Sequence, residues 1–465
     1  MSETDSRGIT ALKTSLPTAS WTQDADVIAP HLTEWRDKYF GQTPIMLTPR
    51  RTADVVTAVN ICREHGLKIV PQGGNTGLVG GQTPQGEVLL SLKKMTAVRE
   101  ANPTTNALII EAGATLVAAQ DAATSIGRKF PLTLSSEGSC TVGGVLSTNA
   151  GGNHVLKYGT TKALVFGVEA VLANGEIWNG LTSLRKDNRG FDVGRLLLGA
   201  EGTLGIITAA SLKLSPIPAH VQRVMVGLNS PAAAVELLSH CRSANALSMF
   251  EVMPAIGYRA AVDNFAKIRD PFTNPHDWYA LIDWDVETEA QGEALAANKL
   301  GAAMEAGLIQ DAVIAQNKAQ AASLLAIREH MSAAQKFLGG SIKQDITVPI
   351  SDIPAFLKTA NKAMQKLIPN CRPISFGHFG DGNIHYNIAQ PENMDREAFL
   401  AQWESVSETV FDIVDSYGGS ISAEHGIGIM KRETLAKRYP AKVAVMRSIK
   451  QALDPDGMMN PRCLI

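Results

Sequence analysis

This 465-residue sequence has no large excess of positive or negative charge. It also has no closely spaced cysteines and no long apolar runs. The 43 Lys and Arg side chains nearly balance the 45 Asp and Glu side chains, which leaves a formal net charge of -2, and no dense run of Lys and Arg occurs. A chain without a basic patch has no long-range field that would attract a polyanion. Nucleic acid is therefore not an expected partner.

The cysteines also narrow the possible chemistry, because no closely spaced pair suggests zinc, iron-sulfur or thiol redox sites. Five free thiols are expected, at Cys62, Cys140, Cys241, Cys371 and Cys463. No stretch stays apolar for about 18 residues, the length of a membrane-spanning helix. The first residues lack the basic start and apolar run of a secretory signal. We therefore expect a cytoplasmic protein without a transmembrane segment.

Length and composition indicate a globular protein of more than one domain. With 45% hydrophobic residues, 19% charged residues and 40 glycines, the chain can bury a large core, but it is longer than one core usually supports. The proline-containing segment SPIPAH at 215–220 is the expected boundary. We predict a first domain over 1–217 with its core from about residue 40, a second over 218–425, and a C-terminal segment, 426–465, that returns to the first.

The apolar spacing predicts an α+β chain. Residues 44–70 are typical of a strand, a helix led by Thr52 and a second strand. After the boundary, the VMVGL and YALIDWDV segments favour strands, while 287–338 and 395–416 have helical spacing. Further strands are expected in the first domain at 88–92, 107–115, 165–173 and 205–214.

Three glycine-rich segments stand out: PQGGNTGLVGG at 71–81, SSEGSCTVGGVLSTNAGGN at 135–153 and GAEGTLG at 199–205. Glycine-rich loops can turn several backbone N–H groups toward one anion, such as a pyrophosphate. The spacing matches neither G-x-G-x-x-G nor a phosphate loop that ends in Gly-Lys-Ser/Thr. Nicotinamide and ATP are therefore disfavoured as ligands.

Taken in order, these segments resemble the FAD domain of flavoproteins of the vanillyl-alcohol oxidase type. The resemblance implies a two-part FAD-binding domain followed by an α+β substrate domain with an antiparallel sheet. Some relatives attach FAD through a histidine of the first loop, where this chain has Asn75 and no histidine, so non-covalent FAD is expected. The implied cofactor-binding residues are Gly73, Gly74, Asn75, Thr76, Gly77, Ser136, Gly138, Ser139, Gly143, Gly144, Asn149, Gly151, Gly152, Glu201, Gly202 and Ile207.

The segment SFGHFGDGNIHYN at 375–387 suggests a second site. Its Asp-Gly pair at 381–382 lies between two β-prone runs and predicts a two-residue hairpin turn. In that register His378 opposes His385 at about 5 Å, and Asn387 shares their face. Two imidazoles that converge in this way suit a metal ion. An ordinary polar pair of histidines is the alternative.

A third ligand is available in SAEHGIG, where Glu424 precedes His425. Two histidines and one carboxylate are compatible with Zn, Mn, Fe or Co acting as a Lewis acid. The motifs HFGDGNIH and AEHGIG resemble the C-terminal domain of FAD-linked D-lactate and D-2-hydroxyglutarate dehydrogenases. That resemblance implies a divalent metal, zinc first, on His378, His385 and Glu424. It also implies His425 as the catalytic base, a role that suits the ordinary pKa of imidazole.

The same resemblance extends to groups that would bind a substrate. The segments AIREHMSAA and SIKQDITVP place Arg328 and Lys343 where the 2-hydroxyglutarate enzymes are similar to this chain, and Ser332 stands where those enzymes have Thr. Asn387 completes the expected set. Lys343 favours a dicarboxylate, since D-lactate relatives tend to lack a lysine there. Solvated surface charges are the alternative for Arg328 and Lys343.

These patterns predict an FAD-dependent dehydrogenase that oxidises a small D-2-hydroxy acid, first D-2-hydroxyglutarate, to the 2-oxo acid with metal assistance. A D-lactate or glycolate dehydrogenase, alone or as a subunit of a complex, is the main alternative. A covalent-flavin sugar or alcohol oxidase and a non-enzymatic binding module are the others. An electron-transfer flavoprotein or a quinone is the expected electron acceptor, and a homodimer is one option for the assembly.

Overall fold

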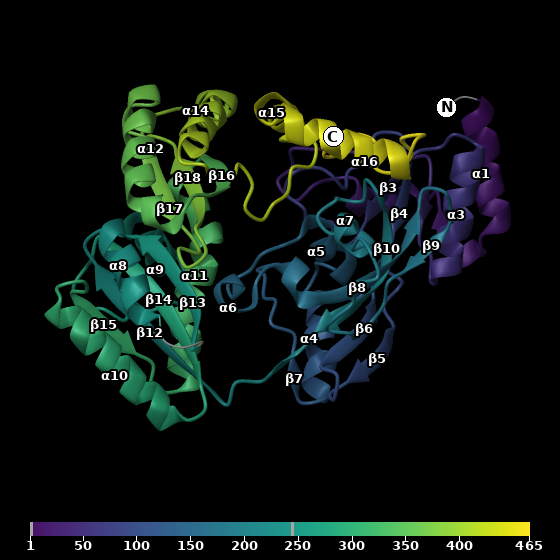
Figure 1. The fold of residues 1–465 in the computed structure, drawn as a ribbon. Helices are drawn as coiled ribbons and strands as arrows, with labels where there is room; N and C mark the ends of the chain where they lie inside the picture. Colours follow the sequence, from purple (N-terminus) through teal and green to yellow (C-terminus); the bar gives the residue numbers. More distant parts are fainter. Residues whose placement is uncertain (1–2, 243–245) are drawn as a thin grey trace. The chain divides into compact units, whose positions relative to one another are not determined.

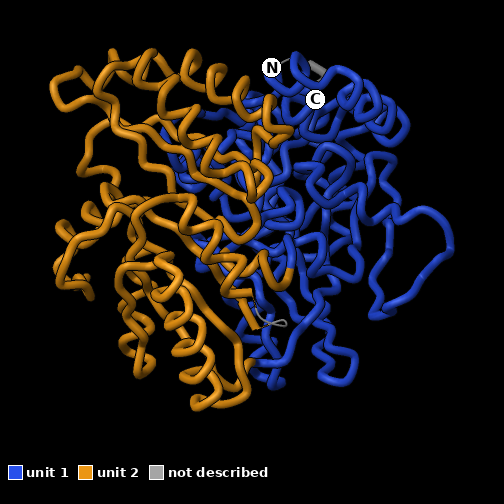
Figure 2. Tube along the Cα trace, turned by 60° about the vertical axis from the view of Figure 1, so that its left-hand side comes forward, with its two compact units in different colours: residues 1–152, 159–217, 424–465 blue, residues 153–158, 218–423 orange. Residues whose placement is uncertain are grey.

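The structure, a computed structural model, describes residues 3–242 and 246–465. It divides into two compact units, drawn in blue and orange in Figure 2. Unit 1 comprises Met1–Gly152, Gly159–Ile217 and Glu424–Ile465. Unit 2 comprises Asn153–Tyr158 and Pro218–Ala423. Each unit is therefore built from segments that are distant in the sequence.

A small mixed sheet opens unit 1 and carries the first glycine loop (Figure 1). The strand, helix and strand expected over 44–70 are confirmed, and the helix α3 (Thr52–Glu64) buries Val55, Ala58 and Val59. The two expected strands, found at Met46–Leu47 and Ile69–Gln72, do not pair with each other. The strand Val88–Ser91 lies between them and is parallel to both. In spatial order the strands are β1 (Trp21–Thr22), β2 (Met46–Leu47), β4 (Val88–Ser91) and β3 (Ile69–Gln72).

A five-stranded antiparallel sheet forms the rest of the framework of unit 1. The strands expected at 107–115, 165–173 and 205–214 are confirmed, and the third of them lies at the centre and is buried over Gly205–Leu212. In spatial order the strands are β5 (Val98–Asn102), β6 (Ala107–Glu111), β10 (Gly205–Lys213), β8 (Val165–Leu172) and β9 (Ile177–Asn179). A two-stranded ribbon joins β7 (Arg128–Lys129) to β11 (Ser215–Pro216).

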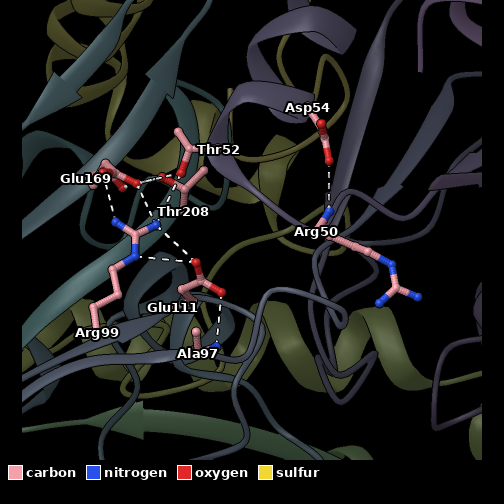
Figure 3. A network of polar contacts seen from close by, with 8 residues as sticks. All are labelled: Arg50, Thr52, Asp54, Ala97, Arg99, Glu111, Glu169 and Thr208. Atoms are coloured by element: carbon pink, nitrogen blue, oxygen red, sulfur yellow. Dashed lines mark hydrogen bonds and ion pairs between the residues drawn. The ribbon is translucent and has the colours of Figure 1, made fainter. Parts of the chain in front are cut away.

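A network of charged side chains ties α3 to this sheet (Figure 3). The Arg99 guanidinium contacts Glu169 at 3.0 Å and Glu111 at 3.2 Å. Glu169 also accepts hydrogen bonds from Thr52 at the start of α3, at 2.7 Å, and from Thr208 of β10, at 2.8 Å. Burial acts to raise the pKa of Glu169, but these partners hold it below its usual value.

Short helices complete unit 1, and the C-terminal segment pairs with its first sheet. Met459 forms a β-bridge with Ile69 of β3, and the Arg462 guanidinium contacts Glu87 at 2.8 Å. The remaining helices of unit 1 are α1 (Glu3–Ser15), α2 (Ala25–Ile28), α4 (Leu116–Ser125), α5 (Val142–Thr148), α7 (Val193–Leu197), α15 (Arg432–Arg438) and α16 (Pro440–Leu453).

Unit 2 contains a four-stranded antiparallel sheet, with strands in the order β13 (Leu247–Pro254), β14 (Trp278–Val286), β12 (His220–Leu228) and β15 (Asp311–Ile314). A buried cluster that includes Met253, Tyr258 and Met331 packs helices on this sheet. The helical interpretation of 287–338 is confirmed for two helices but interrupted by β15. The helices around this sheet are α6 (Val155–Tyr158), α8 (Pro231–Cys241), α9 (Ala255–Asn264), α10 (Glu289–Glu305) and α11 (Lys318–Ala334).

A second, three-stranded antiparallel sheet of unit 2 has the order β16 (Ser341–Thr347), β18 (Asn383–Ala389) and β17 (Arg372–Phe376). Gln344 and Tyr386 are cross-strand partners on one face of this sheet. Gln344 Nε2 donates to the hydroxyl of Ser407, in the helix over 403–416, at 2.7 Å. The Tyr386 hydroxyl donates to Asn361 Oδ1, in the helix over 353–367, at 2.9 Å. One face of the sheet is therefore covered by two helices. The helices of this part are α12 (Ile353–Leu367), α13 (Arg396–Leu400) and α14 (Trp403–Ser416).

The predicted α+β class is confirmed by these sheets and helices. All five cysteines are free and buried, as expected. Within the described ranges, no helix has both the length and the apolar character needed to cross a bilayer.

Candidate active site

In unit 1 the first glycine loop lies directly against the loop that precedes α5. A Cβ atom on Gly74 would stand 2.1 Å from the Ser139 carbonyl oxygen, and one on Gly73 would stand 2.2 Å from Thr141 Oγ1. Such separations are far inside van der Waals contact, so both positions require glycine. Thr141 also caps α5, because its hydroxyl accepts a hydrogen bond from Gly144 N at 3.3 Å. The two loops therefore hold each other in place.

The three glycine-rich segments line one cavity of about 250 Å³. In the part of the chain that the structure describes, Gly138, Ser139, Asn149 and Gly152 are not among the lining residues. Asn149 instead ends α5 with φ of 50° and accepts a hydrogen bond from Lys162 N at 2.9 Å. The predicted cofactor residues that line the cavity are Gly73, Gly74, Asn75, Thr76, Gly77, Ser136, Gly143, Gly144, Gly151, Glu201, Gly202 and Ile207.

The lining fits a dinucleotide such as FAD. Much of the wall is glycine backbone, whose N–H groups suit a diphosphate. Asn75 adds a second indication, since its Nδ2 donates to Thr33 O at 3.0 Å while its Oδ1 is buried and has no partner among the described residues. Buried acceptors are normally satisfied, so a hydrogen-bond donor of a bound molecule is the expected partner of this oxygen.

Glu201 lines the cavity and also anchors the segment that carries His425. Its Oε1 and Oε2 accept hydrogen bonds from Ile427 N and Gly428 N, both at 2.7 Å, and Cys463 Sγ donates to Oε2 at 3.1 Å. Burial raises the pKa of the Glu201 carboxyl, although these donors act in the opposite direction. The carboxylate is therefore an anchor of the 426–428 backbone.

Glu424 and His425 belong to unit 1 and line the same cavity. A Cβ atom on Gly151 would stand 2.9 Å from Glu424 Oε1, so the second glycine loop contacts this carboxylate. Sequence reasoning assigned these two residues to metal binding and catalysis, and did not predict that they would line the cavity of the glycine loops. The cavity thus combines cofactor-type walls with a carboxylate and an imidazole.

In unit 2 the predicted two-residue hairpin register is wrong. The strand pairing places Phe376, and not His378, opposite His385. Gly377, with φ of 149°, leaves β17 and exchanges two backbone hydrogen bonds of 3.0 Å with Val252 of β13. The connection is therefore longer than two residues. The imidazoles of His378 and His385 are still close, with ring centroids 5.5 Å apart.

The opposite face of the β16–β18–β17 sheet gathers polar side chains, and we call it the polar face. Lys343 opposes Asn387, and Asp345 opposes His385 two residues along the same strands, so the four side chains share this face. Asp345 Oδ1 lies 3.8 Å from His385 Nδ1 and accepts a hydrogen bond from Asn383 Nδ2 at 3.0 Å. Asn387 Nδ2 donates to Gln335 Oε1 at 2.9 Å. This face carries a cationic group, an anionic group and an imidazole together.

Arg328 lies beside the polar face. Its guanidinium stands over the Phe376 ring at 4.9 Å, and its Nε donates to Glu251 Oε2 at 2.7 Å. The other Glu251 oxygen accepts a hydrogen bond from His378 Nδ1. Burial acts to raise the pKa of Glu251, but His378 and Arg328 hold it well below its usual range. Ser332 is exposed one turn later on α11.

Sequence reasoning missed Asp345 and Glu251. Asp345 has a local signal, since it stands two residues after Lys343 in a strand and so shares its face. Glu251 has none, because it is 127 residues from His378 and reaches it only through the β-bridge between Val252 and Gly377. For the metal, the chemistry of the donors in unit 2 fits, since two imidazoles with a carboxylate beside them suit Zn and similar divalent ions.

Comparisons with known proteins match two families along the chain, and the second match extends into the C-terminal segment of unit 1. Residues 43–180 match the family described as FAD binding domain, and residues 217–464 match the family described as FAD linked oxidases, C-terminal domain. D-2-hydroxyglutarate dehydrogenase, mitochondrial, of Arabidopsis thaliana is 34% identical over 99% of this chain and 82% of its own length. The D-2-hydroxyglutarate dehydrogenase of Xanthomonas citri pv. viticola is 33% identical over 92% of this chain and 90% of its own length.

Solved structures show the same fold at low sequence identity. p-Cresol methylhydroxylase with substrate bound has a TM-score of 0.79 and 15% identity, over 100% of this chain and 98% of that one. The 4-ethylphenol oxidase from Gulosibacter chungangensis, in its isoeugenol complex, has a TM-score of 0.74 and 16% identity, over 99% and 97%. The predicted fold of the vanillyl-alcohol oxidase type is thereby confirmed.

Proposed function

The chain belongs to the family of FAD-linked oxidases, and on that premise we propose that it is an FAD-dependent dehydrogenase that oxidises D-2-hydroxyglutarate to the 2-oxo acid. The choice of substrate rests on the 34% identity, over nearly the whole chain, to an enzyme named for D-2-hydroxyglutarate. The cavity of unit 1 and the polar face of unit 2 support the same reaction. A flavin accepts hydride from a hydroxy-acid carbon, while the protein supplies binding and placement.

Within this proposal FAD is bound without a covalent link, in the cavity lined by the glycine loops. The loop that would carry an attachment histidine has Asn75 instead, and the buried, unpartnered Oδ1 of that residue is available to the cofactor. Gly73, Gly74 and Gly77 of the same loop expose backbone toward the diphosphate. Of the predicted residues that do not line the cavity, Asn149 ends α5 and so supports the second glycine loop rather than the cofactor.

Two cations would recognise the carboxylates of the substrate. Arg328 is held by Glu251 through Nε, and its Nη1 and Nη2 are the atoms that would bind a substrate carboxylate. Lys343 shares the polar face with Asn387. A dicarboxylate uses both cations, whereas D-lactate or glycolate would leave one without its anion.

His425 would take the proton from the 2-hydroxyl group, since imidazole titrates near neutral pH. His378, His385 and Glu424 are the ligands proposed for a divalent ion, zinc first, with Mn, Fe or Co as alternatives. Such an ion would polarise the 2-hydroxyl group and the adjacent carboxylate. His378 and His385 lie together in unit 2, whereas Glu424 is proposed from its sequence motif.

The electron acceptor is proposed to be an electron-transfer flavoprotein or a quinone, and a homodimer is the proposed assembly. A cytoplasmic location remains a prediction from the sequence, while the relatives in Arabidopsis thaliana and Bos taurus have mitochondrial in their names.

A substrate panel tests the proposal. Purified protein is assayed with an artificial electron acceptor and D-2-hydroxyglutarate, D-lactate, D-malate or glycolate. We expect the highest kcat/KM with D-2-hydroxyglutarate. A preference for D-lactate or glycolate would contradict the assigned substrate but leave the flavin chemistry intact. Colourless protein without flavin would contradict both.

A further inference from the structure

Glu251 connects two groups that the proposed function uses separately. Its Oε2 accepts a hydrogen bond from Arg328 Nε at 2.7 Å, and its Oε1 accepts one from His378 Nδ1. The carboxylate is completely buried, with 0% of its side chain exposed. All three residues belong to unit 2. One buried anion thus contacts both the proposed substrate cation and a proposed metal ligand.

The backbone explains why the three residues meet. Val252 of β13 and Gly377 after β17 exchange hydrogen bonds of 3.0 Å, which joins the two sheets of unit 2 at this point. Glu251 and His378 are the neighbours of these two residues in the chain, and α11 brings Arg328 to the same place. The position of Glu251 is therefore set by main-chain pairing and not by its own side chain.

We propose that Glu251 is a positioning residue that fixes His378 as its Nδ1–H tautomer and at the same time orients Arg328 toward the substrate. A carboxylate has only acceptor sites, so the His378 nitrogen that faces it carries the proton. In the neutral imidazole the opposite nitrogen, Nε2, then keeps its lone pair for a metal ion. Partners of this kind orient metal-ligating histidines, and their loss typically weakens metal binding 10- to 100-fold. This inference deepens the proposed function and rests on it for the roles of Arg328 and His378.

The variant Glu251→Gln makes a specific chemical change. The guanidinium of Arg328 only donates, so the amide oxygen turns toward Arg328 and the amide NH₂ turns toward His378. His378 Nδ1 must then accept, which moves the proton to Nε2 and blocks the ligating nitrogen. The expected results are a rise of about 10- to 100-fold in the metal dissociation constant and a higher KM for D-2-hydroxyglutarate.

The control variant is Asp283→Asn. Asp283 of β14 is also a carboxylate with 0% exposure, and it pairs with Arg223 at 2.6 Å. Its cross-strand neighbour on β13 is Met249, so it belongs to the same sheet as Glu251. Removal of one partner from a buried ion pair is destabilising in both cases. The control should therefore lower Tm as Glu251→Gln does, but leave the metal dissociation constant and KM at wild-type values.

The tautomer itself gives a readout that does not depend on turnover. Long-range ¹H–¹⁵N spectra of FAD-loaded, chelator-treated protein with ¹⁵N-histidine distinguish the two imidazole tautomers, and His378→Gln identifies the signal. We expect Nδ1–H in the wild type and Nε2–H in Glu251→Gln. Nε2–H in the wild type overturns the proposal even if the variant does not fold, and equal loss of metal in Asp283→Asn overturns it as well. If the tautomer switches but the wild type does not oxidise D-2-hydroxyglutarate, the proposed function fails while the role of Glu251 toward His378 stands.

Discussion

Glu201 Oε2 accepts a hydrogen bond of 2.7 Å from Gly428 N, a residue 227 positions later in the chain. Its other oxygen accepts one from Ile427 N, so a single carboxylate holds two consecutive amides. His425 stands just before these amides, in a segment that also lines the cavity. The placement of the proposed base therefore depends on an anion outside its own segment.

Glu201→Gln should lower both stability and kcat. An amide keeps one acceptor but turns an NH₂ group toward a backbone N–H, which leaves a buried donor unsatisfied at about 1 to 3 kcal/mol. Thermal unfolding and steady-state kinetics measure the two effects. Cys463→Ala is the control, because it removes the 3.1 Å contact to Glu201 but neither amide bond. A Glu201→Gln enzyme with wild-type kcat would show that the anchor does not place His425.

The network of Figure 3 predicts a pH-dependent stability. Because the pKa of Glu169 is lowered, its stabilising contribution is present above the unfolded value of about 4.3 and is lost as the pH falls through the folded value. Arg99→Gln should therefore reduce Tm at pH 7, and its difference from wild type should shrink toward pH 3. Arg50→Gln is the control, since Arg50 is exposed and its guanidinium points away from Glu169. A constant difference across this range would contradict the role of Glu169.

The glycine loops predict which substitutions abolish flavin binding. Gly74→Ala places a Cβ atom 2.1 Å from the Ser139 carbonyl oxygen, so the two loops must separate and FAD occupancy should fall. Gly138→Ala is the control, because no atom lies within 4 Å of its added Cβ. Absorbance of the purified variants gives the occupancy, and acid precipitation should release all wild-type flavin into the supernatant. Flavin retained in the pellet would contradict non-covalent binding.

Substitution of Lys343 tests the preference for a dicarboxylate substrate more directly than substitution of Arg328 does. Loss of a desolvated charge-assisted hydrogen bond costs about 1.5 to 3 kcal/mol, which is roughly one to two decades in binding. Lys343→Met should raise KM by that amount for D-2-hydroxyglutarate and little for D-lactate. Arg328→Ala should show the same preference but also lose stability, because it leaves Glu251 buried without one partner. Equal changes on both substrates would exclude Lys343 as a carboxylate-binding residue.

Substitutions of the proposed base and of a proposed metal ligand should have different effects on metal content. His425→Ala is expected to keep FAD and metal but lose roughly two to four decades in rate, the usual contribution of a positioned general base. His385→Ala, on the polar face, should lose metal and turnover while FAD stays bound. Elemental analysis and flavin absorbance of the same samples distinguish the two. Wild-type protein that carries no metal and stays fully active in chelators would mean that the histidine pair is structural.

Local sequence patterns predicted the individual elements well, because their signals lie within a few residues. The apolar face of α3 and the strand runs of β8 and β10 are examples, and the structure confirms them. The glycine segments likewise identified most of the cavity wall, since close contact between backbones leaves a mark in the sequence at Gly73 and Gly74.

Long-range pairing could not be predicted in this way. The hairpin register failed because Gly377 pairs with Val252, a residue of a different sheet, and because Asp381 Oδ1 accepts from Asn383 N and so shapes the turn locally. The same bridge brings Glu251 to His378. A single sequence contains no trace of such a contact, so this bridge contributes to the wrong register and also explains the missing carboxylate.

The interleaving of the two units affects how the protein is made. Residues 153–158 of unit 2 leave the ribosome while unit 1 is incomplete, and unit 1 receives its last segment, 424–465, only after all of unit 2 has been synthesised. Domains usually fold in the order of synthesis, but here neither unit is complete before residue 423 has been made. Until the 424–465 segment has been made, Glu201 lacks the backbone amides of Ile427 and Gly428 that it binds in the folded protein. A premature stop shortly after residue 423 would therefore damage the flavin unit, although every residue of the other unit had been made.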